Sequence, residues 1–380
     1  MAYGPRQIRF HRRLNSLFLA SELLLHVIVY YALYYLFDIN IASLLIVLIF
    51  VFNHTAFSLW LYHAIPEKPW PRYSYPLLIL PFFIWLNSSI IILFLSPLLL
   101  LYFLFPGIPW LIIILGIALV LSIYATAIRP RKLCTRRLTL PLQTLPTDFT
   151  NYRIIHLSDL HIGNLLPMKT YQHWQTAINQ EAADLILISG DFLTFGDTYI
   201  DTFVDFIAGL QAKDGILLST GNHEAFIDLD KLQKNLHHRT TAMIIDGKAH
   251  EIQRGNTKIS IVAIQGIVDN LPVNRRDLDQ VLALTSSTPI VLLSHEGSIF
   301  DDAAAKKIPL TLSGHTHGGQ LALPFISQIN LATKKYRYNS GHYQNKHSHL
   351  YVSNGMGLIN LPMRLGAPPE LAVLTLTTAK

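Results

Sequence analysis

The chain has a single cysteine, Cys134, among its 380 residues. A disulfide within the chain is therefore excluded, and so is a zinc site built from several cysteine thiolates. The lack of disulfides fits a reducing compartment. The sequence also has no low-complexity tract and no internal repeat of about 20 to 50 residues, which argues against solenoid and array architectures.

Acidic residues are scarce in the first part of the chain. Residues 1–144 hold 11 lysines and arginines against 3 acidic residues, a net charge of +8, whereas the remainder holds 19 against 21, a net charge of −2. The overall charge of +6 thus comes from the N-terminal part. Because the C-terminal part lacks a basic stripe, we expect no nucleic-acid partner.

Long apolar runs fill the first third of the chain, and each is long enough to cross a bilayer, which takes about 20 residues. We expect four transmembrane helices, near residues 15–37, 40–62, 77–100 and 108–128. The third is the least regular, because Pro81 and Pro97 can kink or end a helix. Residues 129–150, which are basic and contain prolines, are expected to be a linker to a globular domain at 151–380.

Basic residues flank the predicted spans on one side of the membrane only. They lie before the first span, between the second and third, and after the fourth: Arg6, Arg9, Arg12, Arg13, Lys68, Arg72, Arg129, Arg131, Lys132, Arg136 and Arg137. The positive-inside rule then places both termini, and the globular domain, on the cytoplasmic face. A twin-arginine signal at Arg12-Arg13 is the alternative, but the following apolar run is longer than a signal core and three more spans come next.

Two ionisable residues lie inside the first predicted span. Glu22 and His26 are four residues apart and share one helix face. Ionisable groups within a span can mark a functional site. We favour a structural pair instead, with Asn53 and His54 of the second span as further partners.

Five short apolar segments of the C-terminal part run directly into side chains that can bind a metal ion. The segments are 154–157, 185–189, 216–219, 290–294 and 310–313. The side chains that follow them are Asp159, His161, Asp191, Asn222, His295, His315 and His317. If the segments are strands, their carboxyl ends converge on one site. Carboxylate, imidazole and amide ligands suit a hard or borderline divalent cation, and so many ligands indicate two ions that share one of them.

The local patterns suggest roles for individual residues. Asp159 and His161 are two apart, so strand alternation would aim both at one ion. Asp191 follows a glycine that allows close backbone approach, and its two oxygens could bridge two ions. His223, next to Asn222, could bind metal or act as an acid. The serines beside the ligands are interpreted as small or hydrogen-bonding residues rather than nucleophiles: Ser158, Ser189, Ser294 and Ser313.

The order Asp-x-His, Gly-Asp, Gly-Asn-His-Glu, His, Gly-His-x-His resembles the calcineurin-like metallophosphoesterases over the whole C-terminal domain. The segment 355–370 resembles the membrane-anchored bacterial branch of that family. The resemblance implies a four-layer α/β/β/α sandwich and a bacterial inner-membrane enzyme. It implies two divalent cations, Mn²⁺ first, with Fe, Zn and Mg as alternatives. It assigns Asp159, His161, Asp191 and His317 to one ion, Asp191, Asn222, His295 and His315 to the other, and His223 to the scissile phosphate.

The substrate is less clear from the sequence. The apolar segments 165–168 and 321–326 lie beside the motifs and are either packing or an apolar rim facing membrane lipids. A rim would suit a lipid-linked phosphodiester or pyrophosphate such as UDP-2,3-diacylglucosamine, which membrane-tethered relatives hydrolyse. The alternatives are a general phosphodiesterase for soluble substrates, a non-catalytic metal-binding scaffold, and a transporter with a regulatory domain.

Two further features allow two interpretations each. Arg364 could contact a substrate phosphate or make a structural ion pair. His342, His347 and His349 lie in one polar stretch, which we interpret as a solvated loop rather than a second metal site.

Overall fold

The computed structural model describes residues 39–64 and 67–379, except 72, 104, 107–108, 267–274, 286–288 and 324–325, together with five positions between 27 and 34. The chain forms two compact units. The first comprises Met1–Ala64 and Trp70–Ile128, and the second comprises Ile65–Pro69 and Arg129–Lys380. The short segment Ile65–Pro69 thus belongs structurally to the second unit, although it connects two helices of the first.

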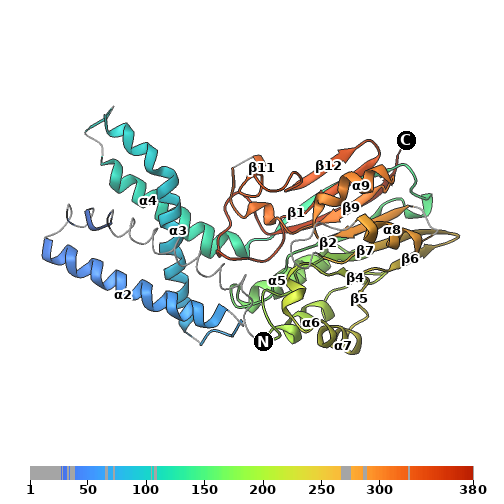
Figure 1. Ribbon diagram of the computed structural model, residues 1–380, viewed down its shortest axis with the longest axis horizontal. Coiled ribbons are helices and arrows are strands. Elements are labelled where there is room, and N and C mark those ends of the chain that lie inside the picture. The colour runs from blue at the N-terminus through green and yellow to red at the C-terminus, as the bar shows by residue number, and fades with distance from the viewer. Residues whose placement is uncertain are drawn as a thin grey trace. The chain divides into compact units, whose positions relative to one another are not determined.

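The first unit consists of apolar helices (Figure 1). They are α2 (Ile39–Ala64), α3 (Leu80–Leu95) and α4 (Trp110–Ile123). Within the described residues, three stretches are long and apolar enough to cross a membrane, namely Ser43–Trp60, Tyr75–Leu98 and Trp110–Arg131. They coincide with the second, third and fourth predicted spans. Only five positions of the first predicted span are described, all of them helical, and Glu22 and His26 lie outside the described residues.

The third predicted span is helical throughout but changes type along its length. A π-helical turn, η1 (Tyr75–Ile79), precedes α3, and a 3₁₀ segment, η2 (Ser96–Phe103), follows it. Pro81 lies at the start of α3, where its missing N–H costs little. Pro97 lies near the start of η2. A proline inside an α-helix removes one backbone hydrogen bond, which agrees with the end of α3 just before it.

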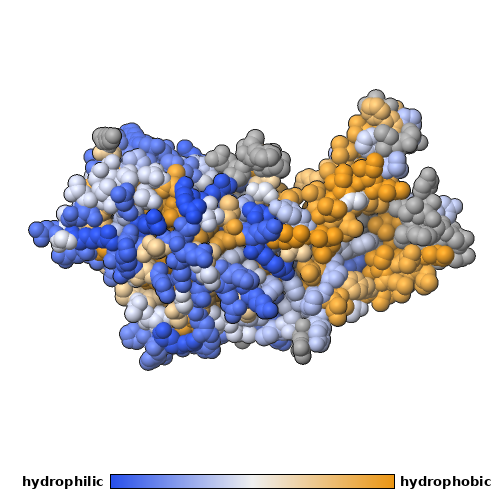
Figure 2. All heavy atoms as spheres, turned by 180° about the vertical axis from the view of Figure 1, so that it is seen from behind, coloured by the Kyte–Doolittle hydropathy of each residue, from blue (hydrophilic) through white to orange (hydrophobic). Residues whose placement is uncertain are grey.

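Buried polar side chains join the helices of this unit. The amide of Asn87 in α3 donates to the hydroxyl of Thr126 at 2.9 Å, and the hydroxyl of Ser122 in α4 donates to the carbonyl of Ile84 at 2.6 Å. Such bonds suit helices that pack in an apolar medium. Large apolar side chains such as Leu48, Phe94 and Val120 remain exposed, and apolar residues gather over the surface of these helices (Figure 2).

The second unit contains two six-stranded sheets. The first has the order β1 (Cys134–Leu142), β14 (Glu370–Thr378), β2 (Tyr152–Leu157), β3 (Leu185–Ser189), β4 (Ile216–Ser219) and β5 (Met243–Ile244). The second has the order β12 (Gly341–Asn345), β13 (Ser348–Val352), β9 (Leu310–Ser313), β8 (Ile290–Ser294), β7 (Thr257–Ile264) and β6 (Ala249–Arg254). A short hairpin, β10 (Ala322–Leu323) and β11 (Ile326–Asn330), stands apart.

The main core lies between the two sheets. Inward-facing residues of both sheets, among them Ile154, Leu185, Ile261, Leu293 and Leu312, form one buried cluster. The helices lie outside the sheets (Figure 1). They are α5 (Met168–Gln180), α6 (Ile200–Ala208) and α7 (Leu229–Arg239) with the first sheet, and α8 (Arg275–Ala283) and α9 (Phe300–Ala305) with the second. The arrangement is the α/β/β/α sandwich that the resemblance implied.

Strand β1 lies within the predicted linker. It pairs in parallel with β14 from Cys134↔Glu370 to Leu142↔Thr378, and Leu140 and Leu142 are buried in the core. Pro141 is tolerated because β1 is an edge strand, where a missing N–H leaves no ladder bond unmade. Residues 134–142 are therefore part of the sheet rather than a free connection.

All five predicted metal-bearing segments are strands, and their bounds match closely: β2, β3, β4, β8 and β9. Strands β2, β3 and β4 run parallel in one sheet, and β8 and β9 run parallel in the other. The sequence does not show this division between two sheets. The carboxyl ends of the five strands meet at one end of the sandwich, and the site lies there.

Candidate metal centre

The structure brings the predicted ligands together in two groups. The ligand atoms of Asp159, His161 and His317 lie within 4.8 Å of one another, and so do those of Asp191, His295 and His315. Each group combines residues that follow strands of both sheets. A third group takes His161 from the first of these and Asp191 from the second, and adds His223.

Asp191 lies between the two groups. Its Oδ2 is 3.5 Å from Nε2 of His161 and 3.2 Å from Nε2 of His295. Its Oδ1 accepts the backbone N–H of His223 at 2.9 Å. One carboxylate oxygen therefore faces imidazoles of both groups, which is the position a bridging ligand would occupy.

The imidazoles point their nitrogens toward common points. Nε2 of His161 lies 3.1 Å from Nε2 of His317, and Nδ1 of His315 lies 3.3 Å from Nε2 of His295. Only one nitrogen of such a pair can donate a hydrogen bond to the other, whereas a cation accepts both lone pairs. The pairing fits metal ligation.

Asn222 supplies an independent test of the fit. Its amide oxygen Oδ1 is buried, and no described residue offers it a hydrogen-bond partner. A buried polar atom without a partner is costly and needs an explanation. Because Asn222 lines the same pocket as Asp191 and His315, a hard cation at the second group would satisfy this oxygen.

The charge distribution also favours cations. Burial lowers the pKa of His161 and His317 well below the usual range and that of His315 to about 3, so these rings are neutral, as metal ligands must be. Burial also lowers the pKa of His295, but the carboxylates of Asp191 and Asp159 outweigh it and raise this pKa to about 10. The carboxylates thus attract positive charge that a divalent cation would supply.

Five ligands have backbone conformations that L-residues rarely adopt. The φ angles are positive at Asp159 (50°), His161 (41°), Asp191 (56°), His315 (70°) and His317 (52°). Each such residue costs about 1 to 2 kcal/mol, and strain of this kind clusters at functional sites. The prediction that strand alternation aims Asp159 and His161 is therefore wrong, because β2 ends at Leu157 and left-handed turns present both side chains.

Two glycines permit the close approach of the strand ends. Gly190 has a φ of +91°, and a Cβ there would lie 2.6 Å from the backbone nitrogen of Gly221. A Cβ on Gly314 would collide with the side chains of Ser158 and Asp159. Glycine is thus required where β3 and β4 meet and where the loop after β9 covers Asp159.

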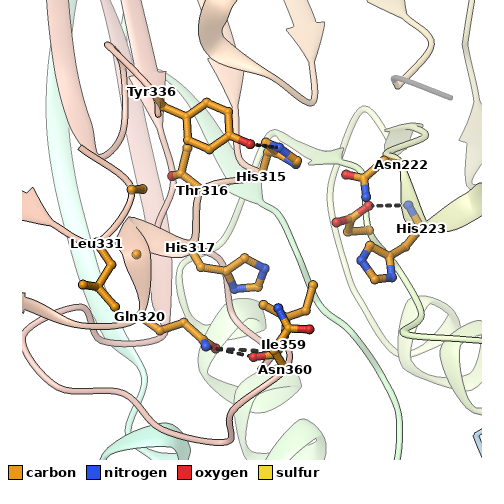
Figure 3. Close-up of a pocket in the computed structure, with 13 residues that line it drawn as sticks. Asn222, His223, His315, Thr316, His317, Gln320, Leu331, Tyr336, Ile359 and Asn360 are labelled. Carbon is orange, nitrogen blue, oxygen red and sulfur yellow. Dashed lines mark hydrogen bonds between the residues drawn. The ribbon is translucent and has the colours of Figure 1, made fainter. Parts of the chain in front are cut away.

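His223 follows β4 and lines the same pocket as the predicted ligands (Figure 3). Its Nδ1 is 2.7 Å from the carbonyl oxygen of Thr194, so Nδ1 carries a proton and donates it. Nε2 is then the nitrogen available for chemistry. The ring packs against Phe195 and Phe226, with centroids 5.2 and 5.6 Å away, which restricts its orientation.

Glu224 is a residue of the site to which the sequence assigned no role. Its Oε2 accepts the backbone N–H groups of Asp191 at 3.0 Å and Gly221 at 2.6 Å, and its Oε1 accepts that of Phe192 at 2.8 Å. The carboxylate therefore ties the turn after β3 to the turn after β4. Its place directly after Asn222-His223 was the available signal.

Tyr336 is a second such residue. Its hydroxyl lies 2.9 Å from Nε2 of His315 (Figure 3). The other nitrogen of His315, Nδ1, faces His295. A partner on the far nitrogen orients a ligating imidazole. No sequence motif marks Tyr336, because it lies in an irregular segment 21 residues after its partner.

Three of the four serines beside the ligands act as hydrogen-bonding residues, whereas the hydroxyl of Ser313 has no partner among the described residues. Ser158 donates to Oδ2 of Asp159 at 2.5 Å, Ser189 pairs with Nε2 of His156 at 2.8 Å, and Ser294 donates to the carbonyl of Glu296 at 3.0 Å. All three are buried. These contacts support ordering of the strand ends rather than nucleophilic roles.

Arg364 is fully buried. Its guanidinium donates to the backbone carbonyls of Asn354 at 2.9 Å, Gly357 at 2.6 Å and Ala367 at 3.1 Å. These bonds hold the loop before β14 together. A structural role therefore explains the residue, through backbone carbonyls rather than the ion pair that was one of our two interpretations.

The other histidine cluster does not form a metal group. Nε2 of His342 lies 2.9 Å from Nδ1 of His349 on the hairpin of β12 and β13. Among the described residues, no third histidine, cysteine or carboxylate joins them as a potential metal group. The pair stabilises the hairpin.

Comparisons with known proteins identify the family of the second unit. Residues 152–319 match the family model of the calcineurin-like phosphoesterases. An uncharacterized metallophosphoesterase of Bacillus subtilis is 30% identical over 261 residues, which cover 67% of this chain and 88% of that protein. One from Helicobacter pylori is 32% identical over 235 residues, 59% of each chain. A transmembrane protein with a metallophosphoesterase domain from Danio rerio is 26% identical over 281 residues, 70% of this chain and 63% of that protein.

The chain therefore belongs to the calcineurin-like metallophosphoesterase family. Members of this class are metal-dependent phosphoesterases, and the clustered histidines and aspartates fit divalent metal binding. The apolar helices of the first unit, together with transmembrane relatives, indicate association with a membrane.

Proposed function

We propose that this chain is a membrane-anchored phosphoesterase that uses two divalent cations, Mn²⁺ first among them, to hydrolyse a phosphodiester or pyrophosphate bond in a lipid-linked substrate. The observation that carries the proposal is the convergence of two buried ligand groups on one pocket. That pocket has a volume of about 280 Å³, and Asp191, Asn222, His223, His315 and His317 line it.

The ligand groups define how the site would hold its cations. Asp159, His161, Asp191 and His317 would bind one, and Asp191, Asn222, His295 and His315 would bind the other. Two cations held in this way supply Lewis acidity toward a phosphoryl group and toward the attacking water. Burial keeps the imidazoles of His161, His315 and His317 neutral.

His223 is the residue best placed to move a proton. Its Nδ1 is fixed by the carbonyl of Thr194, so only Nε2 is available to the pocket. As an imidazolium, it would donate the proton on Nε2 to the leaving oxygen. No protein nucleophile is required.

The lining of the pocket supports an amphiphilic substrate. Leu331 and Ile359 line it beside the polar side chains of Gln320 and Asn360 (Figure 3), and Leu331 is 60% exposed. An exposed apolar residue beside a polar pocket suits an acyl chain attached to a phosphorylated head. A substrate such as UDP-2,3-diacylglucosamine has this form.

One part of the predicted apolar rim does not contribute. Leu165 and Leu166 are buried, so they are packing rather than lipid-facing residues. Met168 is 41% exposed and remains available. In the segment 321–326, the described Leu321 and Ala322 are half-buried.

We further propose that the protein resides in a bacterial inner membrane with the phosphoesterase unit on the cytoplasmic face, next to membrane lipids and without a nucleic-acid partner. The basic residues Lys68 and Arg72, and those after residue 128, support this orientation. Two apolar stretches, Tyr75–Leu98 and Trp110–Arg131, separate the two basic segments, which agrees with their placement on one side.

The test is hydrolysis by the purified full-length protein in detergent and in lipid. With Mn²⁺, it should hydrolyse an activated aryl phosphodiester and lose activity with a chelator. An acylated nucleotide-sugar pyrophosphate should be preferred over its deacylated counterpart. Equal efficiency on both would favour a general phosphodiesterase, and no turnover of any phosphoester would favour a metal-binding scaffold.

A further inference from the structure

A carboxyl group from the connection between α2 and α3 is buried in the phosphoesterase unit. Glu67 lies in the segment Ile65–Pro69, which belongs to that unit, and is only 3% exposed. An acidic residue is rarely buried to this extent unless it is bonded. Its partners therefore indicate what the segment does.

Glu67 contacts the turn that follows the ligand His161. The backbone N–H of Asn164 donates to Oε1 of Glu67 at 2.8 Å, and the side-chain amide of Asn164 donates to the carbonyl of Lys68 at 3.0 Å. A Cβ on Gly163 would lie 2.5 Å from Oε1 and 2.7 Å from Cδ of Glu67. The carboxyl thus occupies the space that the missing side chain of Gly163 leaves.

Glu67 also faces the segment that orients His223. Burial raises the pKa of Glu67 to about 8, while interactions with Asn164, the backbone of Phe195 and the hydroxyl of Thr194 oppose that rise. The carbonyl oxygen of Thr194 is the acceptor for Nδ1 of His223 at 2.7 Å. The carboxyl is therefore bonded to the 162–164 turn through Oε1 and lies near the 193–195 segment, while its buried Oε2 has no hydrogen-bond partner among the described residues.

These two segments are joined to the metal centre by backbone bonds. The N–H of His161 donates to the carbonyl of Asp191 at 3.0 Å, and the N–H of Ile162 donates to that of Phe192 at 2.9 Å. A displacement of either segment would therefore move a predicted ligand or the ring of His223. Glu67 is the residue through which the α2–α3 connection packs against one side of both segments.

We propose that Glu67 is a positioning residue, which docks the α2–α3 connection against the 162–164 turn and the 193–195 segment and thereby holds His161 and His223 in their working geometry. The inference rests on the proposed function, because hydrolysis is one of its readouts. It makes the connection between two apolar helices a part of the catalytic unit. The connection and the phosphoesterase unit must then lie on the same side of the membrane.

Gly163 provides a direct test. It does not have a positive φ, and the three nearest atoms to its Cβ position all belong to Glu67. Gly163→Ala should therefore act mainly by displacing the Glu67 carboxyl. Once Glu67 is itself replaced by alanine, the same substitution should cost nothing further.

The experiment uses the full-length protein in detergent with Mn²⁺ and an aryl phosphodiester. Glu67→Ala and Gly163→Ala should each lower kcat by about 10-fold, within the range known for misplaced catalytic groups, with a smaller change in KM. The double variant should be no worse than either single one. Glu67→Gln, which keeps an oxygen for the N–H of Asn164, should recover most of kcat.

Asp184→Asn is the matched control. Asp184 is also a buried carboxylate, 6% exposed, which accepts from the backbone of Arg153 at 2.7 Å and from Lys213 at 2.9 Å. It precedes β3, whereas Asp191 follows that strand, so it lies at the opposite end of the sheet. Its replacement should lower the midpoint of thermal unfolding but leave kcat within about 2-fold of the unmodified protein.

The outcomes separate the two proposals. If the unmodified protein hydrolyses no phosphoester, the proposed function fails. The docking role of Glu67 is then judged from the midpoints of thermal unfolding of the unmodified protein, the two single alanine variants and the double variant, and non-additive losses support that role. Additive losses in both kcat and thermal midpoint would overturn the role of Glu67. So would an equal loss of kcat in Asp184→Asn at a matched fall in stability, because that result would indicate only a folding defect.

Discussion

Nδ1 of His295 lies 2.6 Å from the backbone carbonyl oxygen of Ser189, and this contact decides which nitrogen of His295 faces the candidate metal centre. A carbonyl oxygen can only accept, so Nδ1 carries a proton, and Nε2 is the nitrogen that a bound cation would meet. That Nε2 lies 3.2 Å from Oδ2 of Asp191. The backbone at the end of β3 thus sets the tautomer of a ligand that follows β8, in the other sheet.

Asp191→Asn is expected to be more damaging than Asn222→Ala. Oδ2 of Asp191 faces imidazoles of both groups, whereas Asn222 contributes one neutral oxygen to one group. The Asp191 variant should lose most of its activity and at least one cation, and the Asn222 variant should keep more of both. Metal content by mass spectrometry and kcat with Mn²⁺ would measure the difference. Two tightly held ions and normal turnover in the Asp191 variant would show that this carboxylate does not bridge.

His223→Ala is expected to keep both cations and to lose rate by about 10²- to 10⁴-fold, the usual range for a general acid. The loss should be smaller for substrates whose leaving group is nitrophenolate, because a good leaving group needs little protonation. Rates for a series of aryl phosphodiesters of graded leaving-group pKa would test this. A uniform loss across the series would indicate that His223 stabilises charge instead of donating a proton.

Tyr336→Phe is expected to weaken metal binding at the second group without abolishing turnover. The phenol hydroxyl is the partner of Nε2 of His315, and loss of such a partner typically costs about 10- to 100-fold in metal affinity or activity. The Mn²⁺ concentration for half-maximal activity should rise. Tyr338→Phe is the control, because the hydroxyl of Tyr338 bonds to the half-exposed Asp301 instead. An equal shift in both variants would argue against the orienting role.

The sequence predicted the five strands and the residues after them because apolar runs and metal-binding side chains are local features. It could not predict β1, because basic residues followed by a proline near the end of the segment are typical of a linker. It also could not predict the positive φ angles at Asp159 and His161, because left-handed turns with non-glycine residues depend on surrounding contacts. Tyr336 and Glu67 reach the site only through tertiary packing.

His156 is expected to make the phosphoesterase unit sensitive to acid. It is fully buried, and burial lowers its pKa from 6.5 to about 3, so the folded state resists protonation more than the unfolded state does. The free energy of unfolding is therefore unaffected by His156 above pH 6.5. It falls as the pH drops from 6.5 toward 3, by about 1.4 kcal/mol per pH unit. In the His156→Gln variant, the midpoint of thermal unfolding should depend less on pH over that range. Replacement of the exposed His237 by glutamine should leave the pH dependence unchanged. Parallel curves for all three proteins would contradict the assignment.

The last prediction concerns topology. The segment Ile65–Pro69 belongs structurally to the phosphoesterase unit, so the α2–α3 connection must lie on the same side of the membrane as residues 129–380. The two apolar stretches between them return the chain to that side, and the charge pattern predicts the cytoplasm. A green fluorescent reporter fused after Lys380 should therefore fluoresce, while alkaline phosphatase fused after Pro106, between the last two predicted spans, should be active in the periplasm. The reverse pattern would overturn the predicted orientation. A cytoplasmic signal from both fusions would mean that the stretch Tyr75–Leu98 does not cross the membrane. The α2–α3 connection and the phosphoesterase unit would then lie on the same side without a crossing at that stretch.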